Sequence, residues 1–140
     1  MISVCFVVHC FEHARAALAA SRRENVRAVL ISAPQLVPCA GVRATIEMMR
    51  LAEKQTDCDA YAVVLDCGRH VGAALAALRL KNVCVFANVN AQTRSRLSEI
   101  AAKTDACVLE AVPAGGMDLK NHFHLESACR DFIQSVKGKG

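Results

Sequence analysis

Five short apolar segments alternate with helix-like segments from one end of the chain to the other, and this alternation constrains the fold most. The segments that read as strands are Ile2–Val8, Ala28–Ser32, Ala60–Asp66, Val83–Ala87 and Ala106–Val112. They are apolar on both faces, as strands are when a parallel sheet is covered by helices. Strands that alternate with helices in this way predict a parallel sheet flanked by helices. We therefore expect one α/β domain over residues 1–140, a doubly wound three-layer α/β/α sandwich with five parallel strands.

Two strand orders are compatible with this alternation. A flavodoxin-like order, 2-1-3-4-5, is the favoured prediction, and a Rossmann-type order, 3-2-1-4-5, is the alternative. In either order, crossovers between parallel strands are right-handed, and the carboxyl ends of all five strands meet at one edge of the sheet. Open α/β sheets bind their ligands at that edge, so it is the place where functional residues are expected.

The composition and one helical segment favour a homodimer. Hydrophobic residues make up 54% of a chain of only 140 residues, which favours the covering of some apolar surface by a second subunit. The alternative is that two-sided burial of a parallel sheet, together with the many small alanines, accounts for this excess. The third helical segment, predicted over Val71–Leu80, has no polar side chain from Val71 to Leu78. A helix that packs on one face of a sheet normally leaves charges on its outer face. We therefore expect Leu75 or Leu78 at or near a dimer interface.

Several classes of protein are disfavoured by the sequence. No segment reaches the roughly 18 apolar residues that span a bilayer, and no basic leader precedes the first strand, so we expect a cytoplasmic protein without a membrane partner. The net charge is +4 and the chain has one Tyr and no Trp, whereas nucleic-acid binding favours a dense basic stripe with aromatic residues. We therefore do not expect a nucleic-acid partner.

The eight cysteines are expected to be reduced thiols. Cys5, Cys84 and Cys107 lie within predicted strands and Cys129 within the last predicted helix, which indicates core positions rather than a disulfide framework. No C-x-x-C pair is present, so neither a zinc knuckle nor a thioredoxin-type motif is predicted. No metal site is expected, and His122 and His124 at the start of a helix would point in different directions.

The predicted strand ends collect the candidate functional residues. In the flavodoxin-like order, His9 at the end of the first strand faces Asp66 at the end of the third, and we predict an acid/base pair in which Asp66 holds the imidazole tautomer. The other predicted ligand-binding residues come from the same edge of the sheet: Cys10, Ser32, Cys67, Gly68, Arg69, His70, Asn88 and Asn90. No cofactor motif is present, so the cofactor is unknown.

Each of these residues also has a purely structural interpretation. Asp66 could cap the turn that begins at Gly68, because Asp commonly forms such turns. Cys10 and Cys67 could be reactive thiols beside a helix N-terminus or small buried residues. Arg69, between Gly68 and Gly72, could help to hold an anion at a strand-to-helix turn, and Asn90 could be the N-cap of the following helix.

The order of elements, with Asp66 at the end of the third strand, resembles a response-regulator receiver domain. The resemblance implies a phosphorylatable Asp66, but the residues around it depart from that family. Only Glu12 is acidic after the first strand, Asn88 stands where receivers have Ser or Thr, and Val112 precedes Pro113 where they have Lys. The run from Leu65 to Leu78 also resembles a βα unit of a barrel enzyme.

Two functions follow as expectations. The first is an α/β domain that binds a small molecule or an anion at the carboxyl edge of its sheet; whether it is an enzyme is open. The second is a non-enzymatic regulatory or interaction module, similar to a degenerate receiver, that acts through a dimer face.

Overall fold

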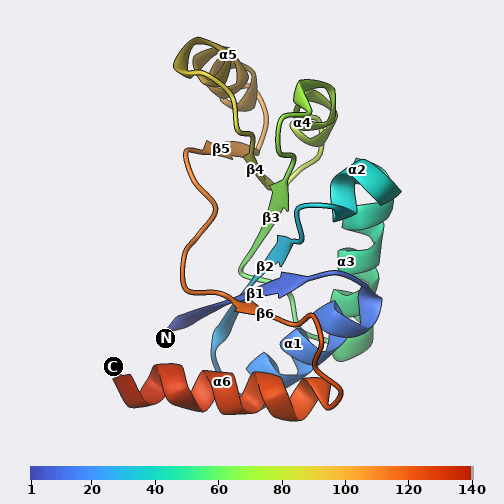
Figure 1. Ribbon diagram of the computed structural model, residues 1–140, viewed down its shortest axis with the longest axis vertical. Coiled ribbons are helices and arrows are strands. Elements are labelled where there is room, and N and C mark those ends of the chain that lie inside the picture. Colours follow the sequence, from blue (N-terminus) through green and yellow to red (C-terminus); the bar gives the residue numbers. More distant parts are fainter. Residues whose placement is uncertain (140) are drawn as a thin grey trace.

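The computed structural model describes residues 1–139 of the chain. Strands and helices alternate along most of it, as the sequence predicts (Figure 1). The strands are β1 (Ser3–Val8), β2 (Arg27–Ser32), β3 (Ala62–Asp66), β4 (Cys84–Phe86), β5 (Cys107–Leu109) and β6 (Met117–Asp118). The helices are α1 (Phe11–Glu24), α2 (Leu36–Ala40), α3 (Val42–Thr56), α4 (Val71–Ala77), α5 (Ala91–Ala101) and α6 (Leu125–Lys139).

All strands belong to one parallel sheet, with the order β5-β4-β3-β2-β1-β6. The prediction of an α/β protein with a parallel sheet is therefore confirmed. The described residues form six strands rather than five, because Met117–Asp118 adds a short strand beside β1. The order also differs from both predicted orders. β2 lies between β1 and β3, whereas a flavodoxin-like order would place β1 there.

The helices pack on one face of the sheet, so the predicted third layer is absent from the part of the chain that the structure describes. Every helix contributes to the main hydrophobic core, together with the alternate strand residues Val4, Phe6, Leu30 and Leu65. The physical reason is the strand order. From β1 to β5 each new strand is added on the same side, and a right-handed crossover then places each helix on the same face.

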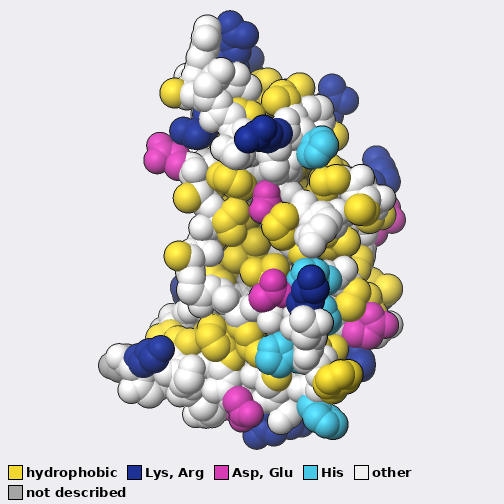
Figure 2. All heavy atoms as spheres, in the orientation of Figure 1, with side chains coloured by type: hydrophobic (Ala, Val, Ile, Leu, Met, Phe, Trp, Pro, Cys, Tyr) yellow, Lys and Arg dark blue, Asp and Glu magenta, His cyan; other side chains and the backbone are white. Residues whose placement is uncertain are grey.

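The opposite face carries no helix of residues 1–139, and we call it the helix-free face. It is formed by the other alternate residues of the strands, which pack with one residue of the β5–β6 connection: Cys5, Val7, Val29, Ile31, Ala62, Val64, Cys84, Leu109 and Val112. Figure 2 shows hydrophobic side chains gathered over the middle of the molecule. Ile31 and Val64 are 1% and 2% exposed even without a covering helix, because neighbouring strands and Val112 pack around them.

The connection between β5 and β6 runs across the helix-free face. β5 and β6 lie at opposite ends of the sheet, so the connection passes β4, β3, β2 and β1, in the order opposite to that in which the strands were added. A right-handed crossover in this direction runs over the face opposite the helices. Val112 packs on the helix-free face there, and a Cβ atom on Gly116 would lie 3.3 Å from the Cβ of Cys5. Strand neighbours are those of a closed six-stranded ring, except that β5 and β6 are not paired.

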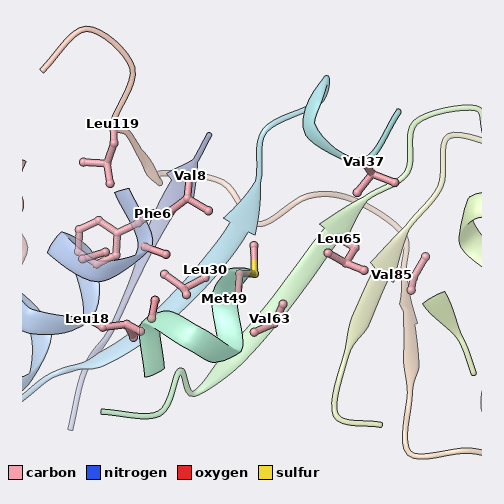
Figure 3. Packing of buried hydrophobic residues seen from close by; sticks show 14 of the residues in the cluster. Phe6, Val8, Leu18, Leu30, Val37, Met49, Val63, Leu65, Val85 and Leu119 are labelled. Carbon is pink, nitrogen blue, oxygen red and sulfur yellow. The ribbon is translucent and has the colours of Figure 1, made fainter. Parts of the chain in front are cut away.

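The main core lies between the sheet and the helices (Figure 3). Phe6 of β1, Leu30 of β2 and Met49 of α3 are fully buried there, and the ring of Phe6 meets Phe132 of α6 edge to face at 6.0 Å between centroids. Leu119, just after β6, is also fully buried. The last strand and the last helix are therefore packed onto the same core as the first strand.

Two further expectations need correction. The third predicted helix is shorter than expected, since α4 ends at Ala77. Leu78, which we expected at a dimer interface, is fully buried, whereas Leu75 is 37% exposed. Among the described residues, no helix is both long and apolar enough to cross a membrane.

A candidate proton-transfer site at the ends of β1 and β6

His9, directly after β1, forms a close pair with Asp118 of β6. The Nε2 atom of His9 lies 2.7 Å from Oδ1 of Asp118. The pairing follows from the sheet, because Val7 and Asp118 are register partners and His9 comes two residues later on the same face of the chain. A carboxylate accepts hydrogen bonds, so Nε2 donates, and in the neutral tautomer that fits this contact Nδ1 carries no proton and can accept one. This is the arrangement of a histidine base held by a carboxylate.

The pKa of Asp118 is consistent with an ionised carboxylate. Partial burial acts to raise it, but the hydrogen bonds from the Lys120 backbone N–H and from His9 outweigh burial and lower the pKa below its usual value. The Lys120 N–H donates to Oδ1 at 2.9 Å. Asp118 is therefore held in place by its own turn as well as by His9, and it remains charged at neutral pH.

His13, one helical turn into α1, supports the same site. Its Nδ1 accepts a hydrogen bond from the backbone N–H of His9 at 3.0 Å, and the two rings meet edge to face with centroids 5.5 Å apart. Burial lowers the pKa of His13, and the nearby charge of His9 lowers it further. The hydrogen bond requires Nδ1 without a proton, so the neutral form of His13 fixes the backbone of His9.

A small cavity opens beside His9. Its volume is about 230 Å³, and it is lined by His9, Ala33, Gln35, Leu36 and Cys39. These residues follow β1 and β2 at the carboxyl edge of the sheet, where a parallel sheet is expected to bind ligands. The cavity is smaller than the roughly 300–1,000 Å³ that drug-sized ligands occupy. It has room for a compact molecule, and the lining residues with polar side chains are His9, Gln35 and Cys39.

Asp66 is not the partner of His9. The prediction that they lie at neighbouring strand ends is wrong, because β2 separates β1 from β3. Oδ1 of Asp66 instead accepts a hydrogen bond from the backbone N–H of Gly68 at 3.0 Å. This is the capping role that the sequence left as an alternative, and it suits Gly68, whose φ of +54° favours glycine. The carboxylate that pairs with His9 comes from β6.

Two other predicted ligand-binding residues are buried in structural positions. The hydroxyl of Ser32 accepts the backbone N–H of Asp66 at 2.9 Å, and Ser32 is fully buried. Cys67 is fully buried as well, and burial, with the charge of Asp66, raises the pKa of its thiol to about 11. A thiol with so high a pKa is poorly suited to act as a nucleophile.

The remaining predicted residues are spread along the carboxyl edge. Arg69 and His70 are exposed in the turn between β3 and α4. Asn88 is exposed, and its backbone N–H donates to the carbonyl of Gly68 at 2.7 Å. Asn90 caps α5, where its Oδ1 accepts the N–H of Thr93 at 2.8 Å, which confirms the predicted N-cap. Cys10, half-buried at the N-terminal end of α1, adjoins His9.

Sequence reasoning missed Asp118, His13 and Cys39. Asp118 lies in a two-residue strand within a segment rich in turn-forming residues, so no hydrophobic run marks it. His13 was detectable in principle, because it follows His9 by four residues and α1 begins between them. Among the described residues, no group of three or more His, Cys, Asp or Glu side chains could hold a metal ion.

Comparison with known proteins adds no functional assignment. No protein-family model matches the chain, and no curated protein matches its sequence. The functional argument therefore depends on the geometry around His9.

Proposed function

We propose that this protein binds a small organic anion, such as a short carboxylate, in the cavity beside His9 and that His9 takes up a proton from solution as the anion binds. The observation that carries the proposal is the contact of 2.7 Å between Nε2 of His9 and Oδ1 of Asp118. It orients the imidazole and stabilises it when it becomes charged. A short carboxylic acid is already ionised at neutral pH, so the proton that charges Nδ1 comes from the buffer, and the bound carboxylate then lies beside an imidazolium whose other nitrogen faces Asp118.

The surroundings of His9 favour a compact ligand. The cavity volume of about 230 Å³ limits the ligand to a compact molecule, and the amide of Gln35 can donate a hydrogen bond to a second ligand oxygen. His13 keeps the backbone of His9 in place through the bond to its N–H, so the site is organised before a ligand arrives.

The test is a thermal-shift screen with short mono- and dicarboxylic acids and inorganic phosphate. At a concentration 100 times its dissociation constant, a true ligand stabilises the fold by about 2.7 kcal/mol, which is a shift of several degrees. We expect the shift to disappear in His9→Ala and to persist in His70→Ala, the matched control, because His70 is an exposed histidine at another strand end.

The proton can be followed separately. When a carboxylate anion binds next to an imidazole that is neutral before binding, one proton enters from the buffer. Calorimetry of the same ligand in two buffers with different ionisation enthalpies measures that proton. We expect uptake in the wild-type protein and a reduced uptake in Asp118→Asn. Equal binding by wild type and His9→Ala would contradict the proposal, as would binding without proton uptake.

A second candidate function is an interaction module that acts through a homodimer. It is favoured by an apolar groove of about 610 Å³ between α2, α3 and α4, whose lining includes Val37, Val42, Ala73 and Ala76. Leu75 of α4 is 37% exposed. In this second proposal a copy of the chain covers α4. Light scattering tests it: Leu75→Lys should convert a dimer to a monomer, and a wild-type monomer at high micromolar concentration would contradict it.

A further inference from the structure

Cys84 and Cys107 are register partners on adjacent parallel strands. Neighbouring strands lie about 4.7–4.9 Å apart, so the two Cα atoms fall within the separation of about 4.4–6.8 Å that a disulfide spans. Side chains of directly paired residues in a parallel ladder project from the same face, and Cys84 projects from the helix-free face. The Sγ atoms of the two residues lie 2.8 Å apart.

We propose that Cys84 and Cys107 form a reversible redox site, which closes to a disulfide when the protein meets hydrogen peroxide. A disulfide bond length is about 2.05 Å, so the two sulfur atoms need to approach by less than about 1 Å. Neither strand has to change its register, because the residues already face each other. The site is distinct from the cavity at His9, since β4 and β5 lie at the other end of the sheet from β1 and β6.

The two cysteines differ in a way that assigns their roles. Cys107 is exposed, whereas Cys84 is half-buried. Burial raises the pKa of Cys84 to about 12, and the hydrogen bond from Cys107 acts in the same direction. Cys84 therefore remains a thiol at neutral pH, and the accessible Cys107 is the residue that meets the oxidant first.

The reaction balances in two steps. The Cys107 thiolate attacks one oxygen of the peroxide and breaks the O–O bond, which gives a sulfenic acid at Cys107 and, after protonation, one water. The sulfur of Cys84 then attacks the Cys107 sulfur, a second water leaves with the Cys84 proton, and the S–S bond forms. Two thiols lose two electrons in total, and the peroxide accepts them. A dithiol reductant restores both thiols.

The disulfide would link the edge strand β5 covalently to β4. β5 pairs only with β4, it has three residues, and α5 lies between the two strands in sequence. A disulfide from residue 84 to residue 107 would enclose α5 in a covalent loop, which restricts the unfolded chain and stabilises the fold. The oxidised protein should therefore melt several degrees above the reduced protein.

Peptide mapping under non-reducing conditions tests the proposal. The intact chain is treated with hydrogen peroxide, blocked with an alkylating reagent and digested with trypsin, which separates residues 82–94 from residues 104–120 by cleavage at Lys81, Arg94, Lys103 and Lys120. We expect these two peptides joined, with a mass two hydrogens below their sum, and separate again after dithiothreitol. The thermal shift should vanish in Cys84→Ser and in Cys107→Ser, and it should persist in Cys39→Ser, a control with another exposed cysteine.

Three results would overturn the proposal. One is Cys107 carrying two or three added oxygens while Cys84 stays free. Another is a disulfide that joins either residue to a different cysteine or to a second chain. The third is a joined peptide pair that dithiothreitol does not separate. If Cys84→Ser does not fold, Cys84→Ala keeps the test intact, because it removes the sulfur without burying a hydroxyl.

Discussion

His9 and Asp118 are 109 positions apart in sequence, yet Nε2 of the first lies 2.7 Å from Oδ1 of the second. The contact depends on β6, which pairs with β1 through only two residues and places Asp118 opposite Val7. Leu119, the next residue, is fully buried in the main core, and its backbone N–H donates to the carbonyl of Val7 at 3.1 Å. The site is therefore anchored by the packing of one leucine.

Removing the imidazole should raise the pKa of Asp118. In His9→Ala the carboxylate loses a hydrogen bond that favours its charged form, while the bond from the Lys120 N–H remains. We expect the Asp118 pKa to move up towards its usual value, which a titration of the carboxyl carbon by NMR measures directly. His70→Ala is the control. If Asp118 titrates identically in wild type and His9→Ala, the hydrogen bond is absent in solution.

Stability should fall on mild acidification because of His13. Its pKa is lowered in the folded protein, so the unfolded chain binds a proton more readily than the folded one. The stabilisation from neutral His13 is therefore complete above the unfolded value of about 6.5, and it is lost as the pH falls through the lower, folded pKa. Urea unfolding between pH 7.5 and pH 4.5 should show this loss.

The variant His13→Asn isolates this contribution. The Asn side chain can place an oxygen where Nδ1 of His13 accepts the N–H of His9, and it does not titrate in this range. We expect the pH dependence of His13→Asn to be shallower than that of the wild type. Two parallel curves would show that His13 titrates equally in the folded and unfolded states.

Glu53 should matter more for stability than Glu47, the other glutamate of α3. It is only 7% exposed, and its carboxylate accepts the N–H of Ala60 at 2.7 Å and contacts Arg50 at 2.9 Å. These bonds tie the end of α3 to the segment before β3. We expect Glu53→Ala to lower the free energy of unfolding by about 1–3 kcal/mol, measured by urea denaturation.

The control for this prediction is Glu47→Ala on the same helix. Glu47 is exposed, and surface substitutions usually change stability by about 0.5 kcal/mol or less. Both variants exchange the same residue types in α3, so the difference in their helix propensity cancels. Equal losses in the two variants would contradict a special role for Glu53.

The parallel sheet could be predicted from the sequence because alternation of strands and helices is a local pattern. The strand order could not. Right-handed crossovers are satisfied whether β3 is added beside β1 or beside β2, and the choice depends on packing between distant side chains. The strands were also expected to lie between two helical layers because they are apolar on both faces. In the structure Ile31 and Val64 are buried by neighbouring strands and by Val112, without a second layer.

One residue of the candidate pair, His9, could be predicted from the sequence, and the other, Asp118, could not. His9 directly follows a clear apolar strand, so the parallel topology alone places it at the carboxyl edge of the sheet. Asp66 ends another such strand and was paired with His9 on the assumption of a strand order that the structure does not have. Asp118 is preceded by Pro113 and two glycines and lies in a strand too short to show a period of two. Only the three-dimensional pairing with β1 reveals it.

The crossing of the β5–β6 connection over the helix-free face leads to a last prediction, in which two glycines respond oppositely to the same change. A Cβ atom on Gly116 would lie 3.3 Å from the Cβ of Cys5 and 3.4 Å from its backbone oxygen, while a Cβ on Gly72 would meet nothing within 4 Å. Gly116→Ala should therefore push the connection away from β1 and destabilise the fold by about 1–3 kcal/mol, as overpacking does. Gly72→Ala, within α4, should stabilise it by about 0.5–1 kcal/mol, since alanine favours the helix. Chemical denaturation measures the free energy of unfolding of both variants. If Gly116→Ala leaves this free energy unchanged, the connection does not pack against Cys5 in solution.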